Sequence, residues 1–265
     1  MIETVTPESV GMSSARLARV DAWLERQVAQ ERLAGASVLI GRRGQPAYFN
    51  CAGRADIENG KAFDDDTIVR IFSMTKAVTT VAAMMLYEEG AFQLDDPIAR
   101  YLPEFRDTRV WTGGDADATE TMPMEIPITV HHLMTHTSGL TYGFMRTNPV
   151  DRMYRQQGME FPGGADTLAG LVERLAQIPL ICQPGTEWNY SVSIDVLGRL
   201  VEVWSGMSLQ AFFTERLFQP LRMTDTGFHV REANHHRLAA LYAPLSGGDM
   251  STVAAGVVDQ FAEKP

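Results

Sequence analysis

Apolar residues recur at helical spacing in several stretches of the chain. Between residues 13 and 33 they fall at Leu17, Val20, Leu24 and Val28 behind a serine, which predicts an amphipathic helix with a serine cap. Further helices are predicted at residues 73–89, 129–140, 167–179, 191–206 and 209–221. Glycines at positions 90, 139 and 206 mark three of the predicted helix ends. The pattern is therefore mainly helical.

Strand signals are concentrated near the N-terminus. Residues 35–56 predict two strands around a glycine-containing turn at positions 42–45. Residues 107–127 carry Gly, Asp, Thr and Pro with few strong apolar positions, and residues 142–165 lack periodicity, so both predict irregular loops. Residues 243–265 predict no element. A lone two-stranded hairpin is marginally stable in water, so we expect further strands to complete the sheet.

Helices combined with an N-terminal sheet indicate an α/β (α+β) fold, with a helical region packed on an antiparallel sheet that looks incomplete. The 265 residues suffice for one large domain with a sizeable core. We expect a single domain over residues 1–265. Within it, residues 1–70 supply the first helix and strands, residues 71–228 form a mainly helical region, and residues 229–265 form a tail of undefined structure.

Composition narrows the classes of partner. The net charge of −10 and the pI near 5.1 disfavour nucleic acid and anionic membranes. No stretch reaches about 18 consecutive apolar residues, and the polar, acidic start resembles no secretory signal, so we expect a cytoplasmic protein. The chain has two cysteines, Cys51 and Cys182. One disulfide is arithmetically possible, but two free thiols suit a reducing cytosol better.

The helix predicted at residues 73–89 carries a serine and a lysine at its start. Ser73 and Lys76 are three positions apart, and this spacing places them on one face of a helix. Serine is a weak nucleophile until a base takes its proton, and a neutral lysine can do so because burial and a helix N-terminus lower its pKa. Arginine stays protonated. Only three of the 23 basic residues are lysines, so Lys76 is notable, although it could also extend to water as a structural residue.

Four stretches, in the family's order, resemble the class C β-lactamase-like serine hydrolases, which include family VIII carboxylesterases and penicillin-binding-protein-like enzymes. They are Ser-x-x-Lys at 73–76, "HHLMTHTSGL" at 131–140, "PGTEWNYS" at 184–191 and the stretch at 197–228. The resemblance covers most of the chain. It implies a β-lactamase/transpeptidase-like fold, an acyl-enzyme on Ser73, and chemistry that needs no metal or organic cofactor.

The stretch "PGTEWNYS" contains Tyr190, which the resemblance implies is the catalytic tyrosine that exchanges protons with Lys76. Residue type alone fits a buried structural tyrosine better. In the β-lactamases this tyrosine begins Tyr-x-Asn, and the asparagine helps to hold an amide. Here that position is Val192, which has no polar side-chain group. The departure favours an ester substrate over a lactam or a peptide.

The family's third motif, a Lys-Thr-Gly or Trp-x-Gly variant on a strand, has no match at the expected place. "WSG" at 204–206 follows too soon after Tyr190 and ends a predicted helix, so we do not assign it that role. That strand normally supplies one backbone donor of the oxyanion hole. We therefore expect a chain truncated at its C-terminal side, and residues 1–265 that are marginally stable and less active than a version with the family's C-terminal strands.

The sequence predicts a serine carboxylesterase acting on a small-molecule ester. Acyl transfer differs only in the acyl acceptor, and β-lactamase or D-alanyl-peptidase activity or a truncated relic with little activity are the alternatives. A second copy of the chain, or residues 246–261, could pair with the open sheet edge, which leaves a homo-oligomer as an option. His132 and His136 share i, i+4 spacing but lack the glutamate of His-Glu-x-x-His, so no metal site is expected. A solvated loop is predicted for His229, His235 and His236.

Overall fold

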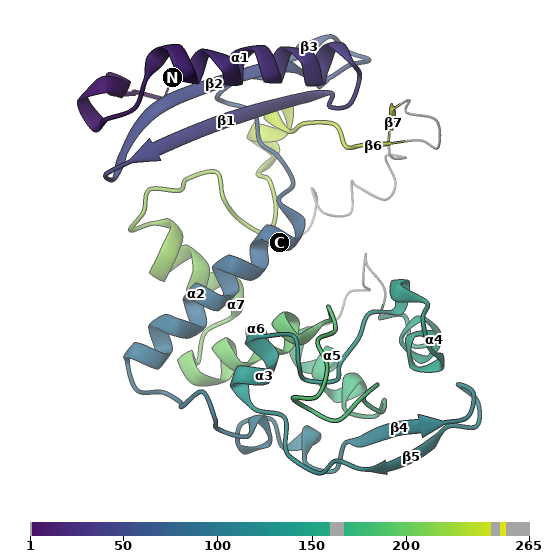
Figure 1. The fold of residues 1–265 in the computed structure, drawn as a ribbon. Helices are drawn as coiled ribbons and strands as arrows, with labels where there is room; N and C mark the ends of the chain where they lie inside the picture. The colour runs from purple at the N-terminus through teal and green to yellow at the C-terminus, as the bar shows by residue number, and fades with distance from the viewer. Residues whose placement is uncertain (1, 160–166, 245–249, 253–265) are drawn as a thin grey trace. The chain divides into compact units, whose positions relative to one another are not determined.

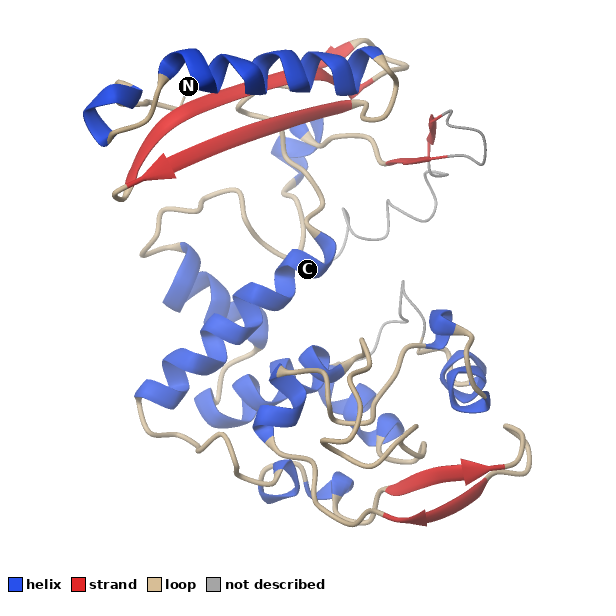
Figure 2. Ribbon diagram, viewed as in Figure 1, coloured by secondary structure: helices blue, strands red, loops and turns tan. Residues whose placement is uncertain are grey.

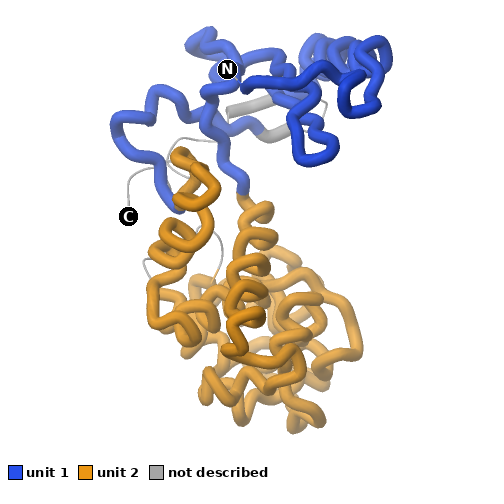
Figure 3. Tube along the Cα trace, turned by 90° about the vertical axis from the view of Figure 1, so that its left-hand side faces the viewer, with its two compact units in different colours: residues 1–71, 228–265 blue, residues 72–227 orange. Residues whose placement is uncertain are grey.

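The computed structural model describes residues 2–159, 167–244 and 250–252 of the chain (Figure 1). The chain divides into two compact units, shown in blue and orange in Figure 3. Unit 1 comprises residues 1–71 and 228–265, and unit 2 comprises residues 72–227. Unit 1 is thus assembled from both ends of the sequence, whereas unit 2 is one continuous segment.

Unit 1 is built on an antiparallel sheet in the order β1 (Gly35–Arg42), β2 (Gln45–Asp56) and β3 (Lys61–Ala62). Helix α1 (Ser14–Ala29), preceded by the short η1 (Pro7–Val10), lies along this sheet (Figure 1). Asp21 of α1 accepts hydrogen bonds from Tyr48 (2.7 Å) and Asn50 (2.6 Å) of β2. The predicted helix and hairpin are therefore confirmed, with the helix ending at residue 29.

The C-terminal part of unit 1 returns to its N-terminal part. Ile68 forms a parallel bridge with Leu238, and Arg70 Nη1 donates to the Ala239 carbonyl (2.7 Å) after the short η7 (Glu232–Arg237). Strand β6 (Tyr242–Pro244) pairs antiparallel with β7 (Met250–Thr252). Residues 243–265 gave no firm prediction, and the structure places part of β6 and all of β7 within them. Most of residues 246–261, suggested as a sheet-edge partner, lie outside the described residues.

Unit 2 is organised around α6 (Ser193–Ser205), whose residues Val196, Leu197, Leu200 and Val201 are completely buried. Around it pack α2 (Thr75–Glu88), α3 (Val130–Met134), α5 (Leu168–Leu175) and α7 (Leu209–Phe212) (Figure 2). The apolar face of α6 follows the 3.6-residue period, as predicted for a helix inside a core. The shorter elements of unit 2 are η2 (Phe72–Met74), η3 (Ile98–Arg100), η4 (Pro103–Phe105), η5 (Gly143–Met145), α4 (Pro149–Gln156) and the π-helical η6 (Phe213–Phe218).

Residues 107–127 are not an irregular loop as predicted. They form the hairpin β4 (Arg109–Gly113) and β5 (Glu120–Pro123). Leu180 holds β4 from its other side, donating to the Arg109 carbonyl and accepting from the Trp111 amide, both at 2.8 Å. Val110 is buried by this arrangement. Its partner lies far along the chain, so the local pattern of residues 107–127 carried too little signal for a strand.

Residues 142–165 were predicted to be irregular, yet they contain helix α4. Asn148 caps it by accepting from the Asp151 amide (3.0 Å), and Asp151 accepts in return from the Asn148 amide (3.3 Å). Pro149 occupies the first turn, where its missing N–H costs nothing. Residues 160–166 lie outside the described residues. The residues of this capping box, Asn148, Pro149 and Asp151, are a helix-start signal in the sequence itself.

The mixture of helices and antiparallel strands confirms the α/β (α+β) fold class. Cys51 and Cys182 are both free thiols. In the described part of the chain, no helix combines the length and the apolar character that crossing a bilayer requires.

Candidate active site

Ser73 lies in the short η2 turn that leads into α2, and its side chain is exposed. The preceding residue, Phe72, has a φ of 42°, in the left-handed region that a bulky residue rarely adopts. Strain of this kind is maintained where the surrounding fold fixes the chain, and it occurs often at functional sites. The turn presents the Ser73 hydroxyl at the start of a helix.

Lys76 lies one helical turn after the serine. Its Nζ donates a hydrogen bond to Ser73 Oγ at 3.2 Å, as the i, i+3 spacing predicts. Lys76 is half-buried and not enclosed in the core, because α2 buries a neighbouring face through Thr79, Ala82, Ala83 and Leu86. The lysine therefore borders the core while its amine reaches the serine.

Tyr190 comes from the loop that precedes α6, and its hydroxyl donates to Ser73 Oγ at 2.5 Å. Asn189 anchors this loop, since its backbone amide donates to the His136 carbonyl (2.8 Å) and its side chain donates to the Leu140 carbonyl (2.9 Å). Burial acts to raise the pKa of Tyr190, but hydrogen bonds with Lys76 and Ser73 and the charge on Lys76 outweigh it, and the pKa is lowered. The phenol is thus easier to deprotonate than a free tyrosine.

A second tyrosine, Tyr142, and an aspartate, Asp195, lie close to Lys76. Lys76 Nζ is 4.7 Å from the centre of the Tyr190 ring and 5.6 Å from that of Tyr142. Burial, and then the nearby Asp195 carboxylate, raise the pKa of Tyr142. Burial also raises the pKa of Asp195, against the opposing charge of Lys76. The fold therefore surrounds the lysine with two phenols and an acid.

His136 completes the cluster. Its ring centre is 5.0 Å from that of Tyr190 and 6.3 Å from that of Trp188, and its Nδ1 is 3.3 Å from Ser191 Oγ. Sequence reasoning did not assign roles to His136, Tyr142 or Asp195. The stretch "HHLMTHTSGL" was recognised as a resemblance, and its position next to Tyr190 was the one available signal for His136.

Val192 occupies the position where the family has an asparagine, and its side chain does not face Ser73. Its side chain is 4% exposed and belongs to the hydrophobic core of unit 2. The neighbouring Ser191 is completely buried and contacts His136. This chain therefore offers no amide group from position 192.

Of the two histidines with i, i+4 spacing, His132 has a structural role. His132 caps α3, because its Nδ1 accepts from the Thr129 amide while the Thr129 hydroxyl accepts from the His132 amide, both at 3.2 Å. Within the described residues, no group of three or more His, Cys, Asp or Glu side chains is arranged to hold a metal ion. Trp204 of "WSG" lies near the end of α6, so it belongs to a helix and not to a strand, and its ring stacks on Phe92 at 4.0 Å.

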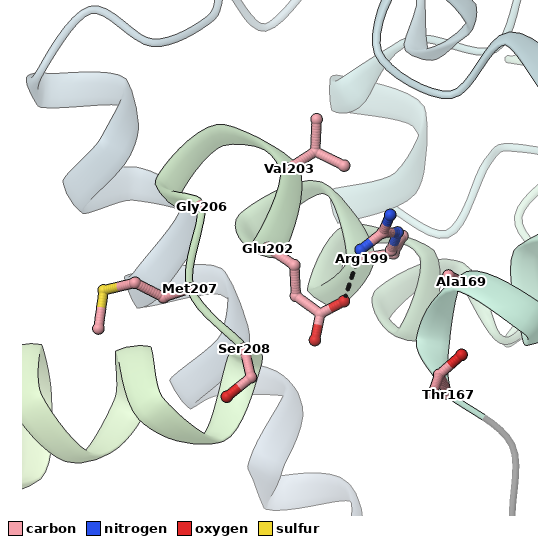
Figure 4. Close-up of a pocket in the computed structure, with 8 residues that line it drawn as sticks. All are labelled: Thr167, Ala169, Arg199, Glu202, Val203, Gly206, Met207 and Ser208. Carbon is pink, nitrogen blue, oxygen red and sulfur yellow. Dashed lines mark hydrogen bonds and ion pairs between the residues drawn. The ribbon is translucent and has the colours of Figure 1, made fainter.

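A shallow depression of about 440 Å³ lies elsewhere in unit 2, beside the C-terminal end of α6 (Figure 4). It is lined by Thr167, Ala169, Arg199, Glu202, Val203, Gly206, Met207 and Ser208. Arg199 and Glu202 pair across 2.9 Å, so neither charge is free for a ligand. None of the residues described above around Ser73 lines it.

Comparisons with known proteins point to one family. The family described as Beta-lactamase matches residues 20–259. Esterase EstB of Burkholderia gladioli is 36% identical over 228 residues, which cover 85% of this chain and 55% of EstB. The structure of EstCE1, described as a hydrolase with promiscuous acyltransferase activity, is similar with a TM-score of 0.76 and 32% identity, covering 89% of this chain and 58% of EstCE1.

Simvastatin synthase (LovD) from Aspergillus terreus has a similar structure, with a TM-score of 0.77 and 27% identity, covering 96% of this chain and 64% of LovD. The chain spans about half the length of the curated relatives it matches. These matches confirm the resemblance predicted from the four sequence stretches and the β-lactamase/transpeptidase-like fold.

Proposed function

Because this chain belongs to the beta-lactamase family, we propose that it is a serine hydrolase that cleaves carboxylic esters through an acyl-enzyme on Ser73. Lys76 and Tyr190 are the proton-transfer groups. The observation that carries the proposal is the convergence of Lys76 Nζ and the Tyr190 hydroxyl on a single atom, Ser73 Oγ. A nucleophile in contact with two titratable groups is the arrangement that covalent catalysis requires.

The proposed reaction has two steps. In acylation, the Ser73 hydroxyl loses its proton to the Lys76–Tyr190 pair, Oγ bonds to the ester carbonyl carbon, and the pair returns the proton to the departing alkoxide. In deacylation, the same pair takes a proton from water and the hydroxide attacks the acyl carbon. The bond between that carbon and Ser73 Oγ then breaks, the carboxylic acid leaves, and the proton returns to Ser73 Oγ. The lowered pKa of Tyr190 supports its part in holding and releasing this proton.

The substrate class follows from what surrounds the serine. Val192 is directed into the core and supplies no amide to hold a lactam or a peptide bond, which supports an ester. The net charge of −10 disfavours nucleic acid and anionic lipid surfaces as partners, which leaves a small molecule as the substrate. EstB is named an esterase, which agrees with this class.

Acyl transfer to an alcohol is a second candidate activity. EstCE1 is described as a hydrolase with promiscuous acyltransferase activity, and the two reactions share the acyl-enzyme. They differ in whether water or an alcohol accepts the acyl group. Product analysis with a short-chain ester in the presence and absence of an added alcohol separates them.

The proposal is tested by labelling the native chain with a fluorophosphonate and locating the adduct by mass spectrometry. We expect one adduct, on Ser73, and none on the heat-denatured chain, because the reactivity depends on the folded contacts to Lys76 and Tyr190. An adduct on another serine, or ester hydrolysis that survives Ser73→Ala, would overturn the assignment.

A further inference from the structure

Three serine hydroxyls form a buried chain that ends at His136. The Leu140 amide donates to Ser138 Oγ (3.2 Å), Ser138 Oγ is 2.8 Å from Ser193 Oγ, and Ser193 Oγ is 2.7 Å from Ser191 Oγ. Ser191 Oγ is 3.3 Å from His136 Nδ1. All three serines have an exposed fraction of 0%. Buried hydroxyls of this kind are found where each has partners for its hydrogen and its lone pairs.

The direction of the chain is fixed at its inner end. A backbone amide can only donate, so Ser138 accepts from Leu140, and Ser193 Oγ is the acceptor that the described residues offer to the Ser138 hydrogen. Each serine that accepts from its neighbour on one side donates to its neighbour on the other. Ser193 therefore donates to Ser191, and Ser191 donates to His136 Nδ1. An imidazole that accepts at Nδ1 carries its hydrogen on Nε2 and is neutral.

The opposite direction leaves a hydroxyl unsatisfied. If His136 carried a hydrogen on Nδ1, it would donate to Ser191, and each serine would donate inward. Ser138 would then accept from both Leu140 and Ser193, and its own hydrogen would have no acceptor that the described residues provide. A buried, unpaired hydroxyl is unfavourable, and a chain of hydrogen bonds pointing one way is strengthened by mutual polarisation.

We propose that this serine chain holds His136 as the neutral imidazole with its hydrogen on Nε2, and that His136 in this form is a positioning residue for Tyr190. The link to Tyr190 rests on the proposed function, whereas the state of the imidazole does not. The His136 ring lies 5.0 Å from the Tyr190 ring, and its carbonyl accepts from Asn189, the residue before Tyr190. His136 is held at a φ of 55°, a conformation that the surrounding contacts must maintain.

The groups facing His136 support a neutral ring. Lys76 approaches from α2, and Tyr190 and Ser191 approach from the segment before α6. Burial lowers the pKa of His136, and the positive charge of Lys76 lowers it further. A neutral His136 leaves the protonation of Tyr190 to be governed by its own contacts with Lys76 and Ser73.

The imidazole state is measured directly by long-range ¹⁵N NMR of the histidine rings, and no activity is needed. The chain has six histidines, so the His136 signals are those lost in His136→Asn. We expect Nδ1 to be unprotonated and Nε2 protonated, with a pKa below that of free histidine. A ring protonated on Nδ1, or one that titrates like free histidine, would overturn the proposal.

Ser193→Ala interrupts the chain of serine hydroxyls and leaves the His136 side chain itself unchanged. Ser191 can then accept from Nδ1, so we expect the preference for the Nε2–H form to fall about tenfold and the pKa of His136 to rise. Ser205→Ala is the matched control, because the Ser205 hydroxyl donates to the Val201 carbonyl and accepts from the Met207 amide, and neither partner belongs to the serine chain. Unchanged His136 signals in Ser193→Ala, or equal changes in the Ser205 control, would contradict the role of the chain.

The positioning role is read from activity. The acid limb of the pH profile should move to higher pH in Ser193→Ala. In His136→Asn the limb should disappear while most activity remains, because Asn Oδ1 can accept from Ser191 and asparagine tolerates a positive φ. His136→Leu should lose more activity than His136→Asn. Equal activity in His136→Asn and His136→Leu, together with an unchanged acid limb of the pH profile in Ser193→Ala, would refute the positioning role. An inactive wild-type chain would refute the proposed function instead, and the NMR result would still stand.

Discussion

The Tyr190 hydroxyl donates to Ser73 Oγ at 2.5 Å although 117 residues separate them in the sequence. The contact follows from the packing of α2 against α6, because Ser73 lies two residues before the first helix and Tyr190 lies three residues before the second. Both catalytic candidates therefore sit at helix starts. The core between the two helices sets the distance between their hydroxyls.

Tyr190→Phe should reduce ester hydrolysis by about 10²–10⁴-fold, the usual contribution of a positioned acid–base group. The substitution keeps the ring and removes only the hydroxyl that contacts Ser73. Steady-state kinetics with a short-chain p-nitrophenyl ester provide the measurement, and Tyr48→Phe in unit 1 is the matched control. A Tyr190→Phe variant as active as the Tyr48 control would exclude the tyrosine from proton transfer.

The phenol of Tyr190 should deprotonate below pH 10, the ordinary value for tyrosine, because its pKa is lowered. Lys76→Ala removes both the hydrogen bond and the positive charge that lower this pKa, and burial, which raises it, remains. The pKa should therefore rise above the wild-type value. Ultraviolet difference titration against Tyr190→Phe isolates this phenol, and a lower pKa in Lys76→Ala would show that the sign is wrong.

Lys76→Arg should be nearly as inactive as Lys76→Ala. Arginine keeps the positive charge but does not give up its proton, and the proposed reaction needs an amine that can. Turnover of the same ester by both variants, with thermal midpoints to confirm folding, tests this. If Lys76→Arg retained most of the wild-type rate, the lysine would act as a fixed charge only.

Short-chain esters should be turned over faster than β-lactams. Val192 is buried in the core, so position 192 supplies no side-chain amide for a lactam carbonyl or side chain. Parallel assays with a p-nitrophenyl ester and a chromogenic cephalosporin give the ratio of kcat/KM. A higher value for the cephalosporin would reverse the assignment and favour a β-lactamase.

Asp195→Asn should stabilise the chain more at neutral than at acidic pH. Burial raises the pKa of Asp195, so the folded state holds the proton more tightly than the unfolded state. Stability from this group is thus fully present below the unfolded pKa and is lost as the pH rises through the folded one. Asparagine is neutral throughout, so the variant avoids this loss.

Thermal midpoints of wild type and Asp195→Asn at pH 4 and pH 7.5 measure the effect, with about 2–4 °C expected for each 1 kcal/mol gained. The difference between the two proteins should widen at the higher pH. A constant difference at both values would mean that the carboxyl is ionised in the folded state at pH 4 as well.

The elements with strong local signals could be predicted from the sequence. Helix α6 repeats its apolar residues at helical spacing and ends at Gly206, and α2 could be placed in the same way. Hairpin β4–β5 could not, because β4 is also held by two backbone hydrogen bonds with Leu180, a residue far outside the hairpin. The local pattern of apolar and polar residues indicates burial and turns. It does not indicate a strand that pairs with a residue far along the chain.

The site shows the same division. Ser73 and Lys76 could be paired from spacing alone, and Tyr190 required a family resemblance. His136, Tyr142 and Asp195 are ordinary residues in sequence terms, and their relevance arises only from where α3, α6 and the connecting loops bring them. Their roles depend on distances to Lys76 and Tyr190 that no single segment encodes.

The division of unit 1 between the two ends of the chain has a consequence for synthesis on the ribosome. Arg70 must wait for the Ala239 carbonyl, 169 residues later, before it can make its hydrogen bond. At about 5–20 residues per second, that delay is on the order of ten seconds or longer. Unit 2, which is continuous and carries Ser73, Lys76 and Tyr190, emerges entirely within the delay. The nascent chain therefore has the proposed catalytic side chains available for assembly while the N-terminal part of unit 1 still awaits the C-terminal segment that bonds to it.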